Sequence, residues 1–205
     1  MSFLGTVYAV VTALGFLSLP SPNDPIGDPY VSVMEGLIIL MAPLLVVCMA
    51  VIHAYAAPEA KAYSLAALAL MTVLACLTST VHFVILTVGD AIESAGSPWG
   101  SLLVSFRWPS VAYAVDILAW DWFFALAMLC AAPVFRGRGL PAGVRLLMVV
   151  SGVLSLVGLI GVPLGDMRYR NIGIVGYGLV APAAFLLLGV VFSRTGVSRR
   201  AASPP

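Results

Sequence analysis

The stretch that decides the fold class is residues 31–57, VSVMEGLIILMAPLLVVCMAVIHAYAA, which is apolar over nearly its whole length. Its only acid is Glu35 and its only histidine is His53. A run of about 20 apolar residues is long enough to cross the hydrocarbon core of a bilayer as an α-helix. The run is continuous rather than alternating, which excludes a strand of a transmembrane β-barrel. We therefore predict a transmembrane helix over residues 31–57.

Other apolar segments of the same kind flank this one and are separated by turns rich in Pro, Gly and Asp. They cover residues 3–19, 61–88, 109–135, 142–163 and 172–193. The first is short for a span, but no basic residue precedes it, so we interpret it as a helix and not as a signal peptide. The sequence predicts an all-α, polytopic integral membrane protein. It forms a single transmembrane domain over 1–205, a bundle of about six transmembrane helices with a short cytoplasmic tail at 194–205.

The composition agrees with lipid as the solvent. Of the 205 residues 61% are hydrophobic and 9% are charged, whereas a soluble domain has roughly 45–50% apolar residues. A soluble chain of this length cannot bury so much apolar surface. The net charge of +1 leaves no basic patch for nucleic acid. The cysteines all lie inside apolar segments, which favours neither a disulfide framework nor a metal site, and no cofactor is predicted.

The basic residues predict the orientation. If both termini are cytoplasmic, the inner loops and the tail hold most of the Lys and Arg, as the positive-inside rule requires. These inner residues are Lys61, Arg136, Arg138, Arg145, Arg194, Arg199 and Arg200. The outer loops then hold only Arg107, Arg168 and Arg170. We expect a multi-pass protein of the cell membrane with both ends inside and the lipid bilayer as its partner.

Glycines are concentrated in the last two segments. Gly152, Gly158, Gly161 and Gly165 lie along 142–163 or just after it, and Gly173, Gly176 and Gly178 open the last segment. The second group does not have the spacing of a dinucleotide-binding loop, and no strand precedes it. Small residues allow helices to approach closely in lipid, so we predict tight packing between these two helices.

Four ionisable side chains lie where lipid disfavours them: Glu35, His82, Asp116 and Asp121. An acid at the bilayer centre costs about 2.5–3.5 kcal/mol on insertion scales. With a rise of about 1.5 Å per residue, Glu35, His82 and Asp116 lie ~6, ~9 and ~10 Å from the outer ends of their helices. These three are expected to share a depth in the outer half of the bundle. Asp121 lies at ~18 Å, near the midplane, and His53 is expected to be a structural, interfacial residue.

Helical spacing assigns these residues to faces. Thr78, Ser79 and His82 share one face, and Tyr113, Asp116 and Trp120 share another. Asp121 points about 140° away from Asp116 at ~100° per residue. A close pair of carboxylates is therefore not expected. Instead, one aspartate would line a pocket while the other anchors a neighbouring helix.

Aromatic and basic residues surround these groups. Trp120 and Trp122 are too deep for the interfacial tryptophan belt, so they form either an aromatic wall or bulky packing. Arg168, Arg170, Asn171 and Tyr177 flank the outer start of the last helix. They either neutralise Glu35 or Asp116, or bind a lipid headgroup, or lie at the phosphate level of the bilayer.

The favoured hypothesis is an intramembrane enzyme that performs acid–base chemistry on a lipophilic, isoprenoid-like or sterol-like substrate, as an isomerase or cyclase. A carboxyl group in an apolar pocket keeps its proton near neutral pH and can donate it to an alkene. Glu35 and Asp116 would donate and accept the proton, with His82 as partner and Asp121 as a second carboxylate. The expected substrate-binding residues are Tyr113, Trp120, Trp122, Ser79, Thr78, Arg168 and Tyr177. The layout resembles small membrane-bound terpene cyclases and sterol isomerases in design only, because no motif of those families is present.

The same residues also suit other functions. Chains of acids and histidines also serve as proton relays in small transporters and channels, although the inner half of the bundle lacks such groups apart from His53. A non-catalytic network that fixes the register of the helices is a further alternative. A haem between His53 and His82, a zinc ion at Glu35, His82 and Asp116, and a Ser79 nucleophile have no supporting spacing.

Overall fold

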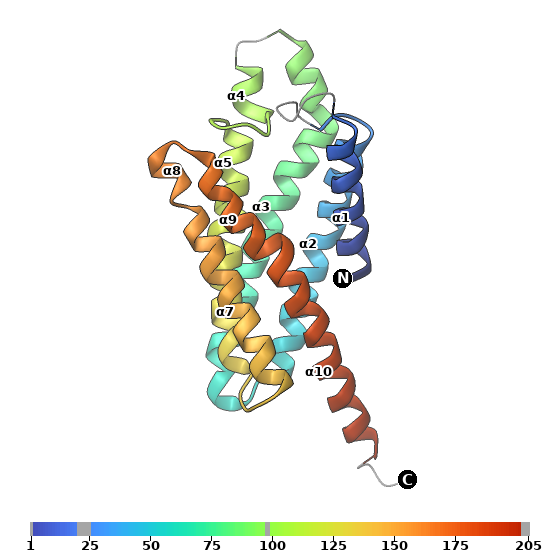
Figure 1. Ribbon diagram of the computed structural model, residues 1–205, viewed down its shortest axis with the longest axis vertical. Helices are drawn as coiled ribbons and strands as arrows, with labels where there is room; N and C mark the ends of the chain where they lie inside the picture. Colours follow the sequence, from blue (N-terminus) through green and yellow to red (C-terminus); the bar gives the residue numbers. More distant parts are fainter. Residues whose placement is uncertain (1, 20–25, 97–98, 202–205) are drawn as a thin grey trace.

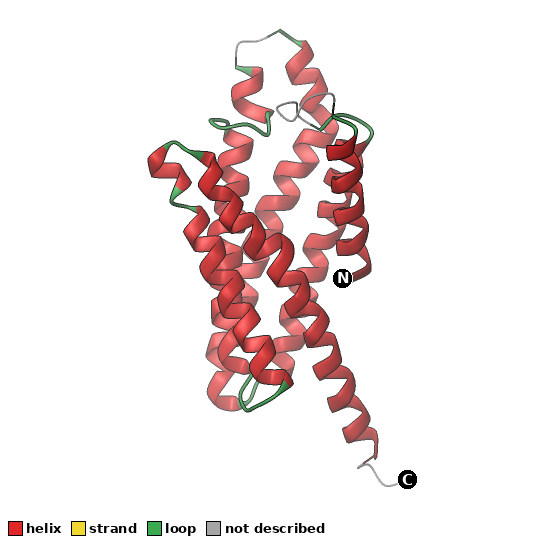
Figure 2. Ribbon diagram, viewed as in Figure 1, coloured by secondary structure: helices red, strands yellow, loops and turns green. Residues whose placement is uncertain are grey.

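The computed structural model describes residues 2–19, 26–96 and 99–201, and this part of the chain contains helices and loops without any strand. The long helices run up and down an elongated bundle (Figure 1) and are joined by short loops (Figure 2). We call the end that carries α4 and α8 the upper end and the opposite end the lower end, as drawn in Figure 1. The upper end corresponds to the side that the sequence predicts to be outside.

Five helical stretches are long and apolar enough to cross a membrane: Tyr30–Tyr55, Pro58–Ile92, Val111–Val134, Leu140–Leu164 and Met167–Arg194. The first is α2 (Tyr30–Tyr55), and the second joins η1 (Pro58–Ala60) to α3 (Lys61–Ser94). The third contains α5 (Val111–Ile117), η2 (Leu118–Phe124), α6 (Ala125–Ala131) and η3 (Ala132–Val134). The fourth contains α7 (Leu140–Gly158) and α8 (Gly161–Leu164). The fifth contains η4 (Met167–Tyr169), α9 (Arg170–Ile174), η5 (Val175–Val180) and most of α10 (Ala181–Ala201).

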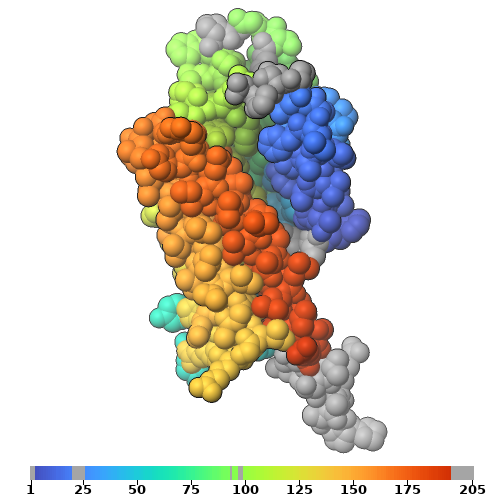
Figure 3. All heavy atoms as spheres, viewed as in Figure 1, coloured from blue at the N-terminus to red at the C-terminus, as the bar shows by residue number. Residues whose placement is uncertain are grey.

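The six predicted spans are not confirmed, because the first helix is too short. Helix α1 (Ser2–Leu17) has 16 residues, which at 1.5 Å each gives about 24 Å, less than the roughly 30 Å of a bilayer core. Helix α1 packs along α2 and also contacts α10. In the space-filling view α1 forms a ridge at the edge of the bundle, and a furrow separates it from α9 and α10 (Figure 3).

Several boundaries differ from those predicted. Helix α3 continues to Ser94 instead of ending at 88, so its upper end and α4 (Gly100–Val104) stand above the rest of the bundle (Figure 1). Helix α5 begins after Ser110, whose hydroxyl accepts a hydrogen bond from the Tyr113 N–H at 3.1 Å and caps the helix. The last span begins at Met167, before the predicted residue 172.

The lower half of the bundle has an apolar core. Met49, Met71, Met128 and Met148 are fully buried there, among other large aliphatic and aromatic side chains. At the lower end of α2, His53 Nδ1 lies 2.9 Å from Ser64 Oγ and so links α2 to α3. This contact agrees with the structural role expected for His53.

The predicted close packing of the glycine-rich helices is confirmed. Helix α7 packs against α9 and η5. A Cβ atom added to Gly158 would lie 2.9 Å from the Gly173 Cα atom, and one added to Gly176 would lie 2.7 Å from the Ser151 carbonyl oxygen. Only glycine allows these backbones to lie so close together.

Candidate functional site

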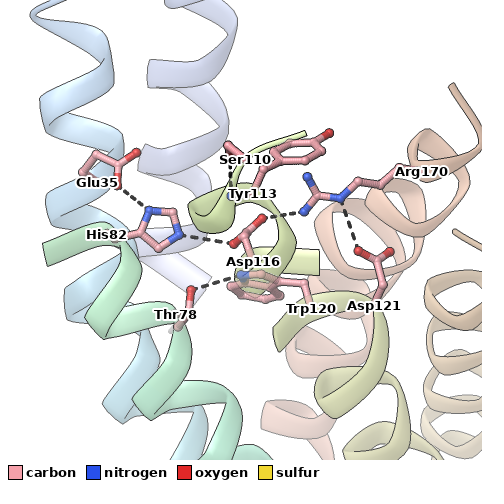
Figure 4. A network of polar contacts seen from close by, with 9 residues as sticks. All are labelled: Glu35, Thr78, His82, Ser110, Tyr113, Asp116, Trp120, Asp121 and Arg170. Atoms are coloured by element: carbon pink, nitrogen blue, oxygen red, sulfur yellow. Dashed lines mark hydrogen bonds and ion pairs between the residues drawn. The ribbon is translucent and has the colours of Figure 1, made fainter. Parts of the chain in front are cut away.

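A row of five ionisable side chains crosses the upper half of the bundle (Figure 4). Glu35 on α2 is hydrogen-bonded to His82 Nδ1 on α3. His82 Nε2 faces Asp116 Oδ1 on α5 at 3.5 Å. The Arg170 guanidinium on α9 donates to Asp116 Oδ2 at 2.5 Å and to Asp121 Oδ2 on η2 at 3.3 Å. We call these five residues the polar row. Glu35, His82 and Asp116 therefore meet at one depth, as their helical positions predict.

The whole polar row is buried inside the protein. The exposed fraction is 0% for Asp121, 2% for His82, 4% for Arg170, 5% for Asp116 and 7% for Glu35. Buried charges must be paired, because removing an ion from water costs several kcal/mol even after relaxation. The alternation of acid and base along the row meets this requirement.

The arginine that pairs with the acids is Arg170, whereas Arg168 was expected among the site residues. The Arg168 side chain is 88% exposed and forms an ion pair with Asp166 at 2.6 Å. Its hydrogen bonds hold the pKa of the Asp166 carboxyl below its usual value. Arg170 opens α9 and is buried, which places its guanidinium between the two aspartates (Figure 4). Counting charges could have selected it, because several buried acids need a buried cation.

A π-helix explains why both aspartates reach Arg170. Residues Leu118–Phe124 form η2 with π-helical hydrogen bonds, in which residue i pairs with residue i+5. The 140° separation between Asp116 and Asp121 assumes a regular α-helix, and the wider π turn reduces it. The same guanidinium binds both carboxylates, so Asp116 and Asp121 both connect their segment to α9.

Aromatic rings cover the polar row. Phe106 stacks on the His82 ring with 5.5 Å between centroids. The Arg170 guanidinium lies 4.3 Å from the centroid of the Tyr113 ring, a cation–π contact. Below the row, Trp120 Nε1 donates to Thr78 Oγ1 at 3.1 Å, and the Trp120 ring packs against Tyr177 at 5.2 Å.

Two predicted site residues lie apart from the polar row. Trp122 is 44% exposed on the outer face of η2, so it does not contribute to the aromatic cover. Ser79 lines a shallow surface groove with Ile39, Thr80, Phe83 and Val84. Sequence reasoning also missed Phe106, which lies in a loop whose approach to His82 no helical periodicity indicates.

Some buried polar atoms find no hydrogen-bond partner among the residues that the structure describes. These atoms are His82 Nε2, Asp121 Oδ1 and Ser155 Oγ. Within the same part of the chain, no group of three or more His, Cys, Asp or Glu side chains is arranged to hold a metal ion. A second groove of about 340 Å³ lies on the surface beside α5 and η2. It is lined by Trp108, Ala114, Ile117, Leu118, Leu159, Val162 and Pro163.

Acids outnumber bases in the polar row. The carboxyl groups of Glu35, Asp116 and Asp121 face one guanidinium and one imidazole. A buried cluster is most stable near neutrality, since an uncompensated charge is costly in a medium of low dielectric constant. The three carboxyl groups therefore exceed the two basic groups of the polar row by one.

No family model, no curated protein and no solved structure matches this chain.

Proposed function

We propose that the polar row is an intramembrane acid–base centre acting on a lipophilic, isoprenoid-like or sterol-like molecule, as an isomerase or a cyclase does. The observation that supports this proposal is the excess of acids over bases in a buried row. A row whose only role was to join helices would be served by one acid for each base. The additional carboxyl groups supply protons that can be donated and recovered.

The proposed reaction conserves atoms and electrons. A protonated carboxyl group, Asp116 or Glu35, gives its proton to one carbon of an alkene and leaves a carbocation. A carboxylate or His82 then removes a proton from a neighbouring carbon, so that the double bond moves or a ring has closed. The faces of Phe106 and Tyr113 are suited to stabilise the cation between these steps. No oxidant, reductant or metal is needed.

An apolar surface groove beside α5 and η2 is where we propose that a lipophilic molecule approaches, although none of its lining residues belongs to the polar row. Its lining includes Ala114, Ile117 and Leu118, which belong to the same segment as Asp116 and Asp121. Its volume of about 340 Å³ is at the lower end of the range for small-molecule sites, roughly 300–1,000 Å³. The apolar core of the lower half disfavours the alternative of a proton-coupled transporter, which would need polar groups through to the other surface.

A second candidate is a structural network without turnover. The observation that favours it is the complete burial of the polar row, which links α2, α3, α5 and α9 through paired charges. In that case the row sets the register of the helices, and no molecule from the membrane reaches it.

Uptake of solvent deuterium tests the acid–base proposal without knowledge of the substrate. The purified protein in lipid nanodiscs is incubated in D₂O with an extract of neutral isoprenoid lipids and sterols. A protonation–deprotonation cycle inserts one deuterium on carbon, which mass spectrometry detects as a protein-dependent increase of one mass unit. We expect this uptake with the wild type and a loss of at least about 100-fold with Asp116→Asn, the usual scale for removing a general acid or base.

The matched control is Asp166→Asn, which makes the same change at a partly exposed acid outside the polar row. It should leave the uptake unchanged. Absence of uptake with the wild type, or equal uptake with Asp116→Asn, would refute the enzymatic proposal and leave the structural network.

A further inference from the structure

Two unpaired polar atoms lie in the same seam between helices. Asp121 Oδ1 and Ser155 Oγ are both fully buried, and neither has a hydrogen-bond partner among the described residues. The seam is the close contact of α7 with α9 and η5. A buried polar atom left unpaired costs about 1–3 kcal/mol, so two of them in one seam require an explanation.

Glycines place the two atoms one helical turn apart. A Cβ atom added to Gly158 would lie 2.6 Å from Asp121 Oδ1, and one added to Gly173 would also overlap this oxygen. A Cβ atom added to Gly176 would lie 2.9 Å from Ser155 Oγ. Ser155 is three residues from Gly158 on α7, and Gly176 is three residues from Gly173 on the opposing helix. Three residues of α-helix correspond to about 4.5 Å along the axis.

This separation suits a single water molecule. One water that donates to both oxygens, or donates to one and accepts from the other, spans about 4.5 Å, because its two hydrogen bonds of ~2.8 Å meet at roughly the tetrahedral angle. Buried water typically satisfies polar groups in this way. Gly158 and Gly173 offer hydrogens on carbon and no side-chain oxygen, so the seam suits neutral water better than a metal cation.

We propose that this seam is a binding site for one water molecule, held between Asp121 Oδ1 and Ser155 Oγ. The site does not depend on the proposed enzymatic activity. It extends the polar row about one turn downwards from Asp121 and gives this carboxyl group a partner for proton exchange. One turn further, Ser151 Oγ donates to the Gly176 carbonyl oxygen at 2.9 Å, and this pair needs no water. The polar extension therefore ends near the middle of the bundle.

Water-selective NMR on the ¹⁵N-labelled protein in nanodiscs tests the proposal. A bound water gives cross-relaxation peaks between the water resonance and the amide hydrogens of Gly158 and Gly173, which lie in helices. We expect these peaks in the wild type. Ser155→Ala removes one of the two partners and should weaken the peaks at least several-fold.

The matched control is Ser151→Ala, at an equally buried serine on the same helix whose hydroxyl already has a partner. It should keep the water peaks at Gly158 and Gly173. Absence of the peaks in the wild type overturns the proposal. Peaks that persist at full strength in Ser155→Ala also overturn it, because Ser155 would then bond to its own helix and not to the water. If Ser155→Ala does not fold, Ser155→Thr, which keeps the hydroxyl, must retain the peaks, and their loss would contradict the site.

Discussion

At the scale of single residues, Arg170 holds the polar row together. Its guanidinium binds Asp116 and Asp121 and lies over the Tyr113 ring. Removing the guanidinium leaves two buried carboxylates without their cation. Removing one carboxylate, in contrast, reduces an excess of negative charge. The two kinds of substitution should therefore lower the free energy of unfolding by clearly different amounts.

We expect Arg170→Ala to lower the free energy of unfolding by about 3–5 kcal/mol, the usual loss when one partner of a buried ion pair is removed. Asp121→Asn should lower the free energy of unfolding clearly less than Arg170→Ala, because Asp116 still pairs with the Arg170 guanidinium. Thermal unfolding of both variants in the same detergent measures the difference. An equal or larger loss for Asp121→Asn would show that the charge count of the row is wrong.

The two tryptophans of η2 offer a second comparison. Trp120→Phe removes the hydrogen bond to Thr78, and we expect a loss of about 0.5–1.5 kcal/mol, the net value of such a bond. Trp122→Phe makes the same change on the exposed face and should be nearly neutral. Unfolding midpoints of the two variants check this order, and a larger loss for Trp122→Phe would contradict the placement of the rings.

At the scale of elements, the two π-helices shape the site. η2 carries Asp121, and η5 directly follows the α9 turn that carries Arg170. Their rings meet through Trp120 and Tyr177. π-helical turns are rare and occur frequently at functional sites. Here the turn in η2 brings two aspartates of one segment to the same arginine.

Gly173→Ala tests the packing of these elements. The added methyl group would overlap Asp121 Oδ1, so we expect a loss of about 1–3 kcal/mol, typical of overpacking. Gly178→Ala on η5 is the control, since its methyl group meets only Ile174 Cγ2 at 3.8 Å, an ordinary contact. Unfolding curves of the two variants should separate clearly. If Gly178→Ala is as destabilising as Gly173→Ala, helix propensity and not the seam determines the effect.

Helix content and the depth of the polar residues could be predicted from the sequence. The length of each apolar segment is visible in the sequence, and the rise per residue of an α-helix is constant. Glu35, His82 and Asp116 were placed together for this reason. Neutralisation of Asp116 by Arg170 is one of the alternatives that the sequence offers. The contact of Asp121 with the same arginine could not be predicted, since a π turn leaves no mark in the periodicity of η2. Phe106 was missed because it reaches His82 from a loop. The sixth span is not confirmed, because the apolar helix near the start of the chain is shorter than the other five.

At the scale of the whole molecule, the bundle is divided along its length. The upper half contains the polar row, and the lower half is closed by an apolar core. The basic residues of the loops lie mainly at the lower end, which the positive-inside rule assigns to the cytoplasm.

Cysteine labelling tests this orientation. In a variant without the native cysteines, Ser101→Cys on α4 should react with a membrane-impermeant thiol reagent on intact cells. Glu59→Cys in η1, at the opposite end, should react only after permeabilisation. Both residues are exposed, so differences in burial do not affect the comparison. The reverse pattern would place the polar row in the inner half of the membrane.

Infrared spectroscopy tests whether the polar row holds a transferable proton, which the proposed acid–base centre requires. A protonated carboxyl group absorbs at a frequency distinct from that of a carboxylate. In the wild type at neutral pH we predict a carboxylic acid band that shifts in D₂O. The band should be lost or displaced in at least one of Glu35→Gln, Asp116→Asn and Asp121→Asn, and retained in Asp166→Asn. A wild-type spectrum without a carboxylic acid band that depends on these three residues would contradict the account.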